Sequence, residues 1–171
     1  DVNLVIETIL KRKFFLLVFV VVSMISCDGT GVFDEYKTVS NTWEIDEEIN
    51  FSIPDLDSLK AYNLFINIRN TNDYQYSNLF IISEMKFPNG KIVKDTLEYT
   101  MAAPDGEWLG TGFSDIKENK LWYKEKVSFK EKGEYTITLQ HAMRKNGEVN
   151  GVSSLQGITD VGFRIENVEK P

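Results

Sequence analysis

The chain has 171 residues, of which 42% are hydrophobic and 26% are charged, the composition of one soluble globular domain. Its formal net charge of −7 argues against binding of nucleic acid through phosphate neutralisation, so we expect no nucleic-acid partner. A single cysteine and a single histidine exclude an intramolecular disulfide, a cysteine-based zinc site and an iron–sulfur cluster. We therefore expect no metal centre and no cofactor.

Residues 1–26 have the pattern of a secretory signal peptide. Basic residues at positions 11–13 precede an apolar run of 12 residues from Phe14 to Ile25, which is short of the roughly 20 residues that cross a bilayer. Residues 1–10 lack an initiator Met and include Asp1 and Glu7, which suit the start of a signal peptide badly. We interpret those ten residues as an over-extended start.

Cys27 follows Ser26 at the end of this segment, in the pattern of a bacterial lipoprotein box, with Met24 where Leu is usual. We expect cleavage before Cys27, acyl chains on its thiol, a tether through residue 32 and a folded domain over residues 33–171. The alternatives are an ordinary signal peptide with an incidental cysteine, or an uncleaved anchor. The expected location is the cell envelope, with the periplasmic face of the outer membrane favoured. Asp28 keeps the inner membrane as the alternative.

The rest of the chain alternates apolar and polar residues with the period of half-buried strands. Strands are predicted over residues 43–53, 64–69, 79–87, 91–99, 121–129, 135–140 and 161–166. Pro88-Asn89-Gly90 is a strong hairpin signal between two of them. Such short strands, each with one buried face, need a second sheet to pack against. We therefore predict an all-β fold, an antiparallel β-sandwich of jelly-roll or immunoglobulin-like type.

Few residues suggest chemistry. His141 ends a strand pattern on its apolar side and has no G-x-S-x-G nucleophile to serve, so we predict a hydrogen-bonded structural histidine. Asp55 and Asp57 supply two carboxylates of a calcium loop but lack the Gly and the closing Glu of an EF-hand. A structural calcium is thus conceivable but unsupported. We expect no catalytic residues and no enzymatic activity.

Two loops are rich in aromatic residues. Trp108 and Phe113 lie among glycines in one loop, and Tyr74 and Tyr76 lie in another. Trp108 could close the open end of the sandwich, the interpretation we favour, or it could stack on a sugar or dock a partner protein. Because the loops come from different hairpins, all four side chains could form one partner or ligand surface, which is the best candidate site.

Several strings of residues resemble the GldH family, the gliding motility lipoproteins of Bacteroidetes. The resemblance covers residues from about Phe33 to Glu166, and Cys27 falls at the lipidation position of the family. The matching strings include residues 62–70, 87–90, 95–99, 104–110, 140–144 and 157–164.

This resemblance implies a non-catalytic envelope lipoprotein that is required for gliding motility. It would be anchored to a membrane and would contact other proteins of the gliding and type IX secretion machinery. The rival interpretation is a carbohydrate- or peptidoglycan-binding lipoprotein that stacks sugars on Trp108, Tyr74 or Tyr76.

Overall fold

The computed structural model describes residues 11–12, 31–145, 147 and 150–168, and from residue 31 onward the secondary structure is all strand. The strands are β1 (Gly31–Thr38), β2 (Thr42–Glu44), β3 (Ile49–Ile53), β4 (Tyr62–Asn70), β5 (Asn78–Lys86), β6 (Ile92–Thr100), β7 (Lys117–Val127), β8 (Tyr135–His141), β9 (Ser154–Gln156) and β10 (Ile158–Asn167).

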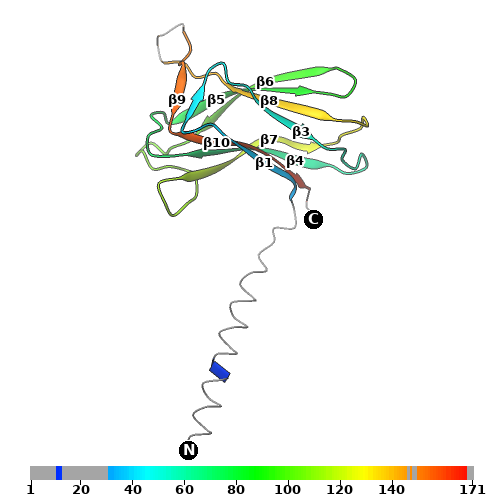
Figure 1. The fold of residues 1–171 in the computed structure, drawn as a ribbon, viewed down its shortest axis with the longest axis horizontal. Helices are drawn as coiled ribbons and strands as arrows, with labels where there is room; N and C mark the ends of the chain where they lie inside the picture. The colour runs from blue at the N-terminus through cyan, green and yellow to red at the C-terminus, as the bar shows by residue number, and fades with distance from the viewer. Residues whose placement is uncertain (1–10, 13–30, 146, 148–149, 169–171) are drawn as a thin grey trace, which may run out of the picture.

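The strands form two four-stranded sheets that pack as a sandwich (Figure 1). Sheet 1 has the order β1-β10-β4-β7 and sheet 2 has the order β3-β8-β5-β6, with every pairing antiparallel. The short strands β2 and β9 pair separately. The predicted antiparallel β-sandwich is confirmed.

The core lies between the two sheets, where the alternation places it. Leu64, Ile66 and Ile68 on β4 are fully buried. They belong to the same apolar cluster as residues of β8 and β10, and the rings of Phe51 and Phe163 meet at 6.1 Å. Burial of each large aliphatic side chain stabilises the fold by about 1.5–3 kcal/mol.

The segment predicted as one strand over residues 43–53 is two strands. The chain turns between β2 and β3, where the indole Nε1 of Trp43 donates to the carbonyl of Glu47 at 3.0 Å. This bond satisfies the polar atom of a side chain that is completely buried. Strands β1 and β9 were not predicted. Since β1 begins at Gly31, the last two residues of the predicted tether belong to the sheet.

The two ends of the sandwich differ in which chain segments they carry. At one end, Gly31 of β1 pairs with Glu166 of β10, and Asn167 pairs with Tyr62 of β4. The chain therefore enters β1 and leaves β10 at the same end (Figure 1), which we call the terminal end. The loops of residues 54–61, 87–91 and 128–134 lie there, joined by ring contacts of Phe129 with Tyr62 and with Tyr135.

The opposite end, which we call the distal end, carries the longer loops. Asn70 of β4 pairs there with both Ile158 and Lys117, and Asn78 pairs with Thr100. The loops of residues 71–77 and 101–116 both leave from this end. The aromatic residues singled out in the sequence therefore lie as far from the chain entry as the strands allow.

Candidate functional site

Three of the four predicted aromatic residues meet at the distal end. The Tyr74 ring lies 5.6 Å from that of Tyr76 and 6.1 Å from that of Trp108. The Trp108 indole donates to Asn72 Oδ1 at 3.0 Å, so two loops are tied together by their side chains. The structure thus brings these three rings into one cluster, as the sequence suggested.

Tyr74 closes the end of the core. It is 3% exposed, and its hydroxyl donates to the carbonyl of Asn78 at 2.8 Å. Burial raises the pKa of Tyr74 far above its ordinary value, so the hydroxyl stays protonated. Gly157 lies directly beneath, with φ +89°, and a Cβ there would overlap the Tyr74 backbone. The plug expected of Trp108 is therefore Tyr74, and Trp108 leans over it partly exposed.

Phe113 stands apart from this cluster on a small hairpin. Thr111 and Glu118 exchange two backbone hydrogen bonds of 2.9 and 2.8 Å, and Lys117 Nζ donates to the Gly112 carbonyl at 2.8 Å. A side chain at Gly112 would strike the Ile116 carbonyl, so the tight turn requires glycine. Phe113 is fully exposed, and within the described residues its ring contacts no other aromatic ring.

Two other exposed apolar side chains belong to the same loop, Ile116 on the hairpin and Leu109 just before it. Leu109 is 56% exposed and Ile116 is 44% exposed. Together with Phe113 they form what we call the distal knob. Such side chains on a held turn are typical of a docking surface, because little conformational entropy is lost when they are buried.

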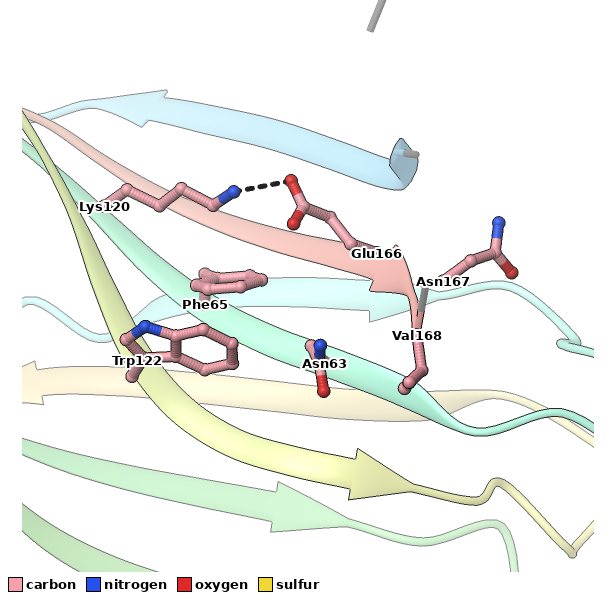
Figure 2. Close-up of a pocket in the computed structure, with 7 residues that line it drawn as sticks. All are labelled: Asn63, Phe65, Lys120, Trp122, Glu166, Asn167 and Val168. Atoms are coloured by element: carbon pink, nitrogen blue, oxygen red, sulfur yellow. Dashed lines mark hydrogen bonds and ion pairs between the residues drawn. The ribbon is translucent and has the colours of Figure 1, made fainter. Parts of the chain in front are cut away.

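A hollow lies on the outer face of sheet 1, where the sequence predicted no site (Figure 2). Its volume is about 430 Å³. The hollow is lined by Asn63, Phe65, Lys120, Trp122, Glu166, Asn167 and Val168. The Phe65 and Trp122 rings are 4.4 Å apart, and Trp122 remains 53% exposed. Two large aromatic residues on the predicted polar faces of their strands were the signal that could have revealed it.

The charged side chains of this hollow are fixed in a row. Glu166 Oε1 accepts from Lys120 Nζ at 2.7 Å and from Arg164 Nε at 2.6 Å. Burial pushes the pKa of Glu166 upward, but the hydrogen bonds from Lys120 and Arg164 outweigh it and lower the pKa. The carboxylate is therefore ionised and neutralised by its neighbours. The hollow offers a stacking surface beside a satisfied ion pair.

His141 lies inside the sandwich and not in a catalytic arrangement. It is 1% exposed, and its ring packs edge-on against Trp43 at 5.5 Å. Within the described residues neither ring nitrogen has a hydrogen-bond partner of normal geometry, and the polar group that acts on the ring is the Trp43 backbone. Within the part of the chain that the structure describes, no carboxylate or hydroxyl is hydrogen-bonded to the ring.

Asp57, one of the two carboxylates considered for a calcium loop, takes part in a turn. Asp57 Oδ1 accepts from the backbone of Leu59 at 3.0 Å and so holds a turn. Over the described residues, no group of three His, Cys, Asp or Glu side chains is placed to hold a metal ion. Nor do those residues include a helix of the length and apolarity that crossing a bilayer requires. Cys27 lies outside the described residues.

Comparison with known proteins decides the family. Residues 31–165 match the family model described as GldH lipoprotein. The chain belongs to the GldH lipoprotein family. The family resemblance is thus confirmed over nearly the whole sandwich. A lipoprotein of this family is anchored to a membrane of the cell envelope.

Two relatives show how close the match is. The chain is 57% identical over 152 residues to the gliding motility lipoprotein GldH homolog of Christiangramia forsetii, covering 89% of this chain and 93% of the relative. It is 50% identical over 151 residues to the gliding motility lipoprotein GldH of Flavobacterium johnsoniae, covering 88% and 94%. Among solved structures, the VP2 subviral particle of infectious bursal disease virus aligns with a TM-score of 0.36 and 12% identity, over 82% of this chain and 34% of that one.

Proposed function

We propose that this chain is a non-catalytic lipoprotein required for gliding motility, accessory to the gliding and type IX secretion machinery. Acyl chains on Cys27 would hold it to the envelope, with the periplasmic face of the outer membrane as the favoured location. The relatives named as gliding motility lipoproteins support the role. The contact with the machinery would be made at the distal end.

The observation that carries this proposal is the distal knob. Phe113 is fully exposed on a turn that Gly112 and Lys117 hold in place. A bulky ring that no core covers is stabilised only when a partner buries it. Trp108 lies in the same loop and could extend the contact. A surface this small suffices when tethering confines both partners to one membrane, because the effective concentration is high.

Replacement of Phe113 tests the proposal. We expect Phe113→Ser to abolish or strongly reduce surface spreading in a deletion strain, and to reduce secretion, while protein level and thermal unfolding stay as in the wild type. Thr96→Ala is the control, because Thr96 is exposed in the middle of β6, away from both ends of the sandwich. Normal spreading and secretion by the Phe113→Ser strain, or equal defects in both strains, would refute the distal contact.

Carbohydrate binding is the second candidate function, and the hollow at Trp122 favours it. An exposed indole beside amide and charged side chains is a common arrangement for stacking and hydrogen bonding a sugar. Titration of peptidoglycan fragments against the protein, followed by tryptophan fluorescence, tests this function. Binding that is lost in Trp122→Ala and kept in Trp108→Ala would support it. An unchanged signal over the titration would remove it.

A further inference from the structure

The surface of the sandwich is polarised between its two ends, and the chain enters at one of them. We propose that the terminal end is a membrane-binding surface. Leu59 lies at the level of the lipid headgroups, and the lysines around it lie against lipid phosphates. The partner is the anionic bilayer surface that holds the acyl chains, so the inference rests on the proposed acylation of Cys27.

The short chain between Cys27 and the sandwich limits the distance between the domain and the membrane. Only residues 28–30 separate Cys27 from Gly31, the first residue of β1. Even fully extended, four residue steps span about 14 Å. Strand β10 has ten residues, and at this length its ends are about 33 Å apart. The terminal end is therefore held close to the headgroups.

Leu59 is the apolar side chain best placed to enter the bilayer surface. It is 94% exposed in the loop between β3 and β4. It lines a hollow together with Asn167 and Val168, which follow directly after the residue that pairs with Gly31. Its loop is held in shape, because the Lys60 amide and the Tyr62 hydroxyl both donate to the Asp57 carbonyl, at 3.1 and 3.3 Å.

The three loops of the terminal end carry four lysines and four acids, so this end is formally neutral. Exposed lysines project from all three of its loops: Lys60, Lys91, Lys130 and Lys132. Within the described part of the chain, Lys60, Lys130 and Lys132 form no ion pair. Of the four acids, Asp57 caps the turn before Leu59, and both oxygens of Glu131 accept from Asn89 at 3.3 and 2.7 Å, while Asp55 and Glu134 are exposed. Lys60, Lys130 and Lys132 can therefore meet anionic headgroups, while Lys91 lies 5.5 Å from the Phe87 ring.

The distal end is more acidic than the terminal end. Its described loops, including the turn before β3, carry seven acidic residues, Asp46, Glu47, Glu48, Asp73, Asp105, Glu107 and Asp115, against the basic residues Lys117, Arg144 and Lys145. An anionic surface repels such a cluster within a distance of about 10 Å, the Debye length at ordinary ionic strength. The asymmetry therefore favours an upright domain, with its terminal end on the lipid and the distal knob pointing away from it.

The outer face of sheet 1 is the competing contact surface. It exposes Trp122, and its edge strand β1 carries the chain entry. However, the charges on that face already satisfy one another, since Arg164 bonds both Asp34 and Glu166 at 2.6 Å. Headgroups would have to replace these bonds. We therefore favour the upright orientation over the flat one.

Site-specific fluorescence tests this inference on the full acylated protein. Leu59→Cys, Phe113→Cys and Trp122→Cys variants are purified from membranes, labelled with an environment-sensitive thiol dye and reconstituted into vesicles of phosphatidylethanolamine and phosphatidylglycerol. Acylation occupies the Cys27 thiol, so each variant has one free thiol. We expect a blue-shifted dye with several-fold less iodide quenching at position 59, and full quenching at position 113.

The controls separate this inference from the function on which it rests. Dye uptake by the wild-type protein would show that the Cys27 thiol is free and would overturn both. No uptake by the wild type, with equal quenching at positions 59 and 113, overturns the membrane surface alone. Greater protection at position 122 than at 59 overturns it in favour of the flat orientation. Lys60→Glu with Lys132→Glu should restore quenching at position 59, and unchanged protection would refute the role of the lysines.

Discussion

Mild acid should destabilise this domain through His141. The ring is 1% exposed and neither nitrogen has a hydrogen-bond partner of normal geometry within the described residues, so protonation would place a poorly compensated charge in the core. Desolvation lowers the pKa of His141 from 6.5 to about 4, against a weak opposing effect of the Trp43 backbone. In the unfolded chain the same ring is solvated and recovers its ordinary pKa.

Proton linkage gives the direction and the size of this change in the free energy of unfolding. Between pH 6.5 and pH 4 the unfolded chain binds the proton that the folded domain rejects, so the free energy of unfolding falls as the pH falls. The full difference corresponds to about 3 kcal/mol. By about pH 5 the loss should reach about 2 kcal/mol. Below the folded pKa of about 4 this contribution levels off.

The assay is urea unfolding followed by tryptophan fluorescence, between about pH 7.5 and pH 5. The chain has a single histidine, so His141→Leu removes every histidine titration at once. We expect the variant to lose the slope of stability against pH in this window, with little change near pH 7.5. The lowered pKa values of Asp95 and Glu166 keep their acid effects below this range. The same slope in both proteins, or no slope in the wild type, would refute the burial argument.

Two further predictions concern single contacts. Gly157→Ala should lower the free energy of unfolding by at least about 2 kcal/mol, because φ is positive and the new Cβ overlaps Tyr74; the control Gly90→Ala has a similar φ of +86° with open space around it, so it should cost less in the same urea titration. Glu166→Gln should cost about 1–3 kcal/mol at neutral pH, because two cations lose their charged acceptor. Because the pKa of Glu166 is lowered, the carboxylate stabilises the fold at pH values above its ordinary pKa of 4.5 and loses this effect in stronger acid. The melting temperatures of the variant and the wild type should therefore converge in stronger acid.

The strands that form the core could be predicted, because their own sequence carries the pattern. Leu64, Ile66 and Ile68 alternate locally, and β4 is found where they predict it. Strand β1 carries no such pattern, since it is an edge strand held mainly by its register with β10. The three-residue strand β9 is stabilised by pairing with β2, where Leu155 lies opposite the buried Trp43. Both depend on partners more than a hundred residues away.

The candidate surfaces, too, could be predicted from the sequence only in part. Loop composition pointed to Tyr74, Tyr76 and Trp108, and the structure brings their rings together. Loop composition could not show that Tyr74 is buried while Phe113 stays exposed, because this difference depends on how the two loops pack. The hollow at Trp122 was missed for another reason. Pairing of β4 with β7 sets Phe65 opposite Trp122, and one strand alone gives no sign of this register.

The two proposed surfaces are consistent with each other because they lie at opposite ends of the same strands. A flexible attachment would leave the distal knob pointing in all directions, and most encounters with a partner would be unproductive. A terminal end held to the lipid at Leu59 as well as at the acyl chains restricts rotation and presents Phe113 at one height above the membrane. A partner in the same membrane then meets a weak but pre-oriented contact at high effective concentration. The small apolar area of the knob is therefore compatible with a stable role in a membrane-bound assembly.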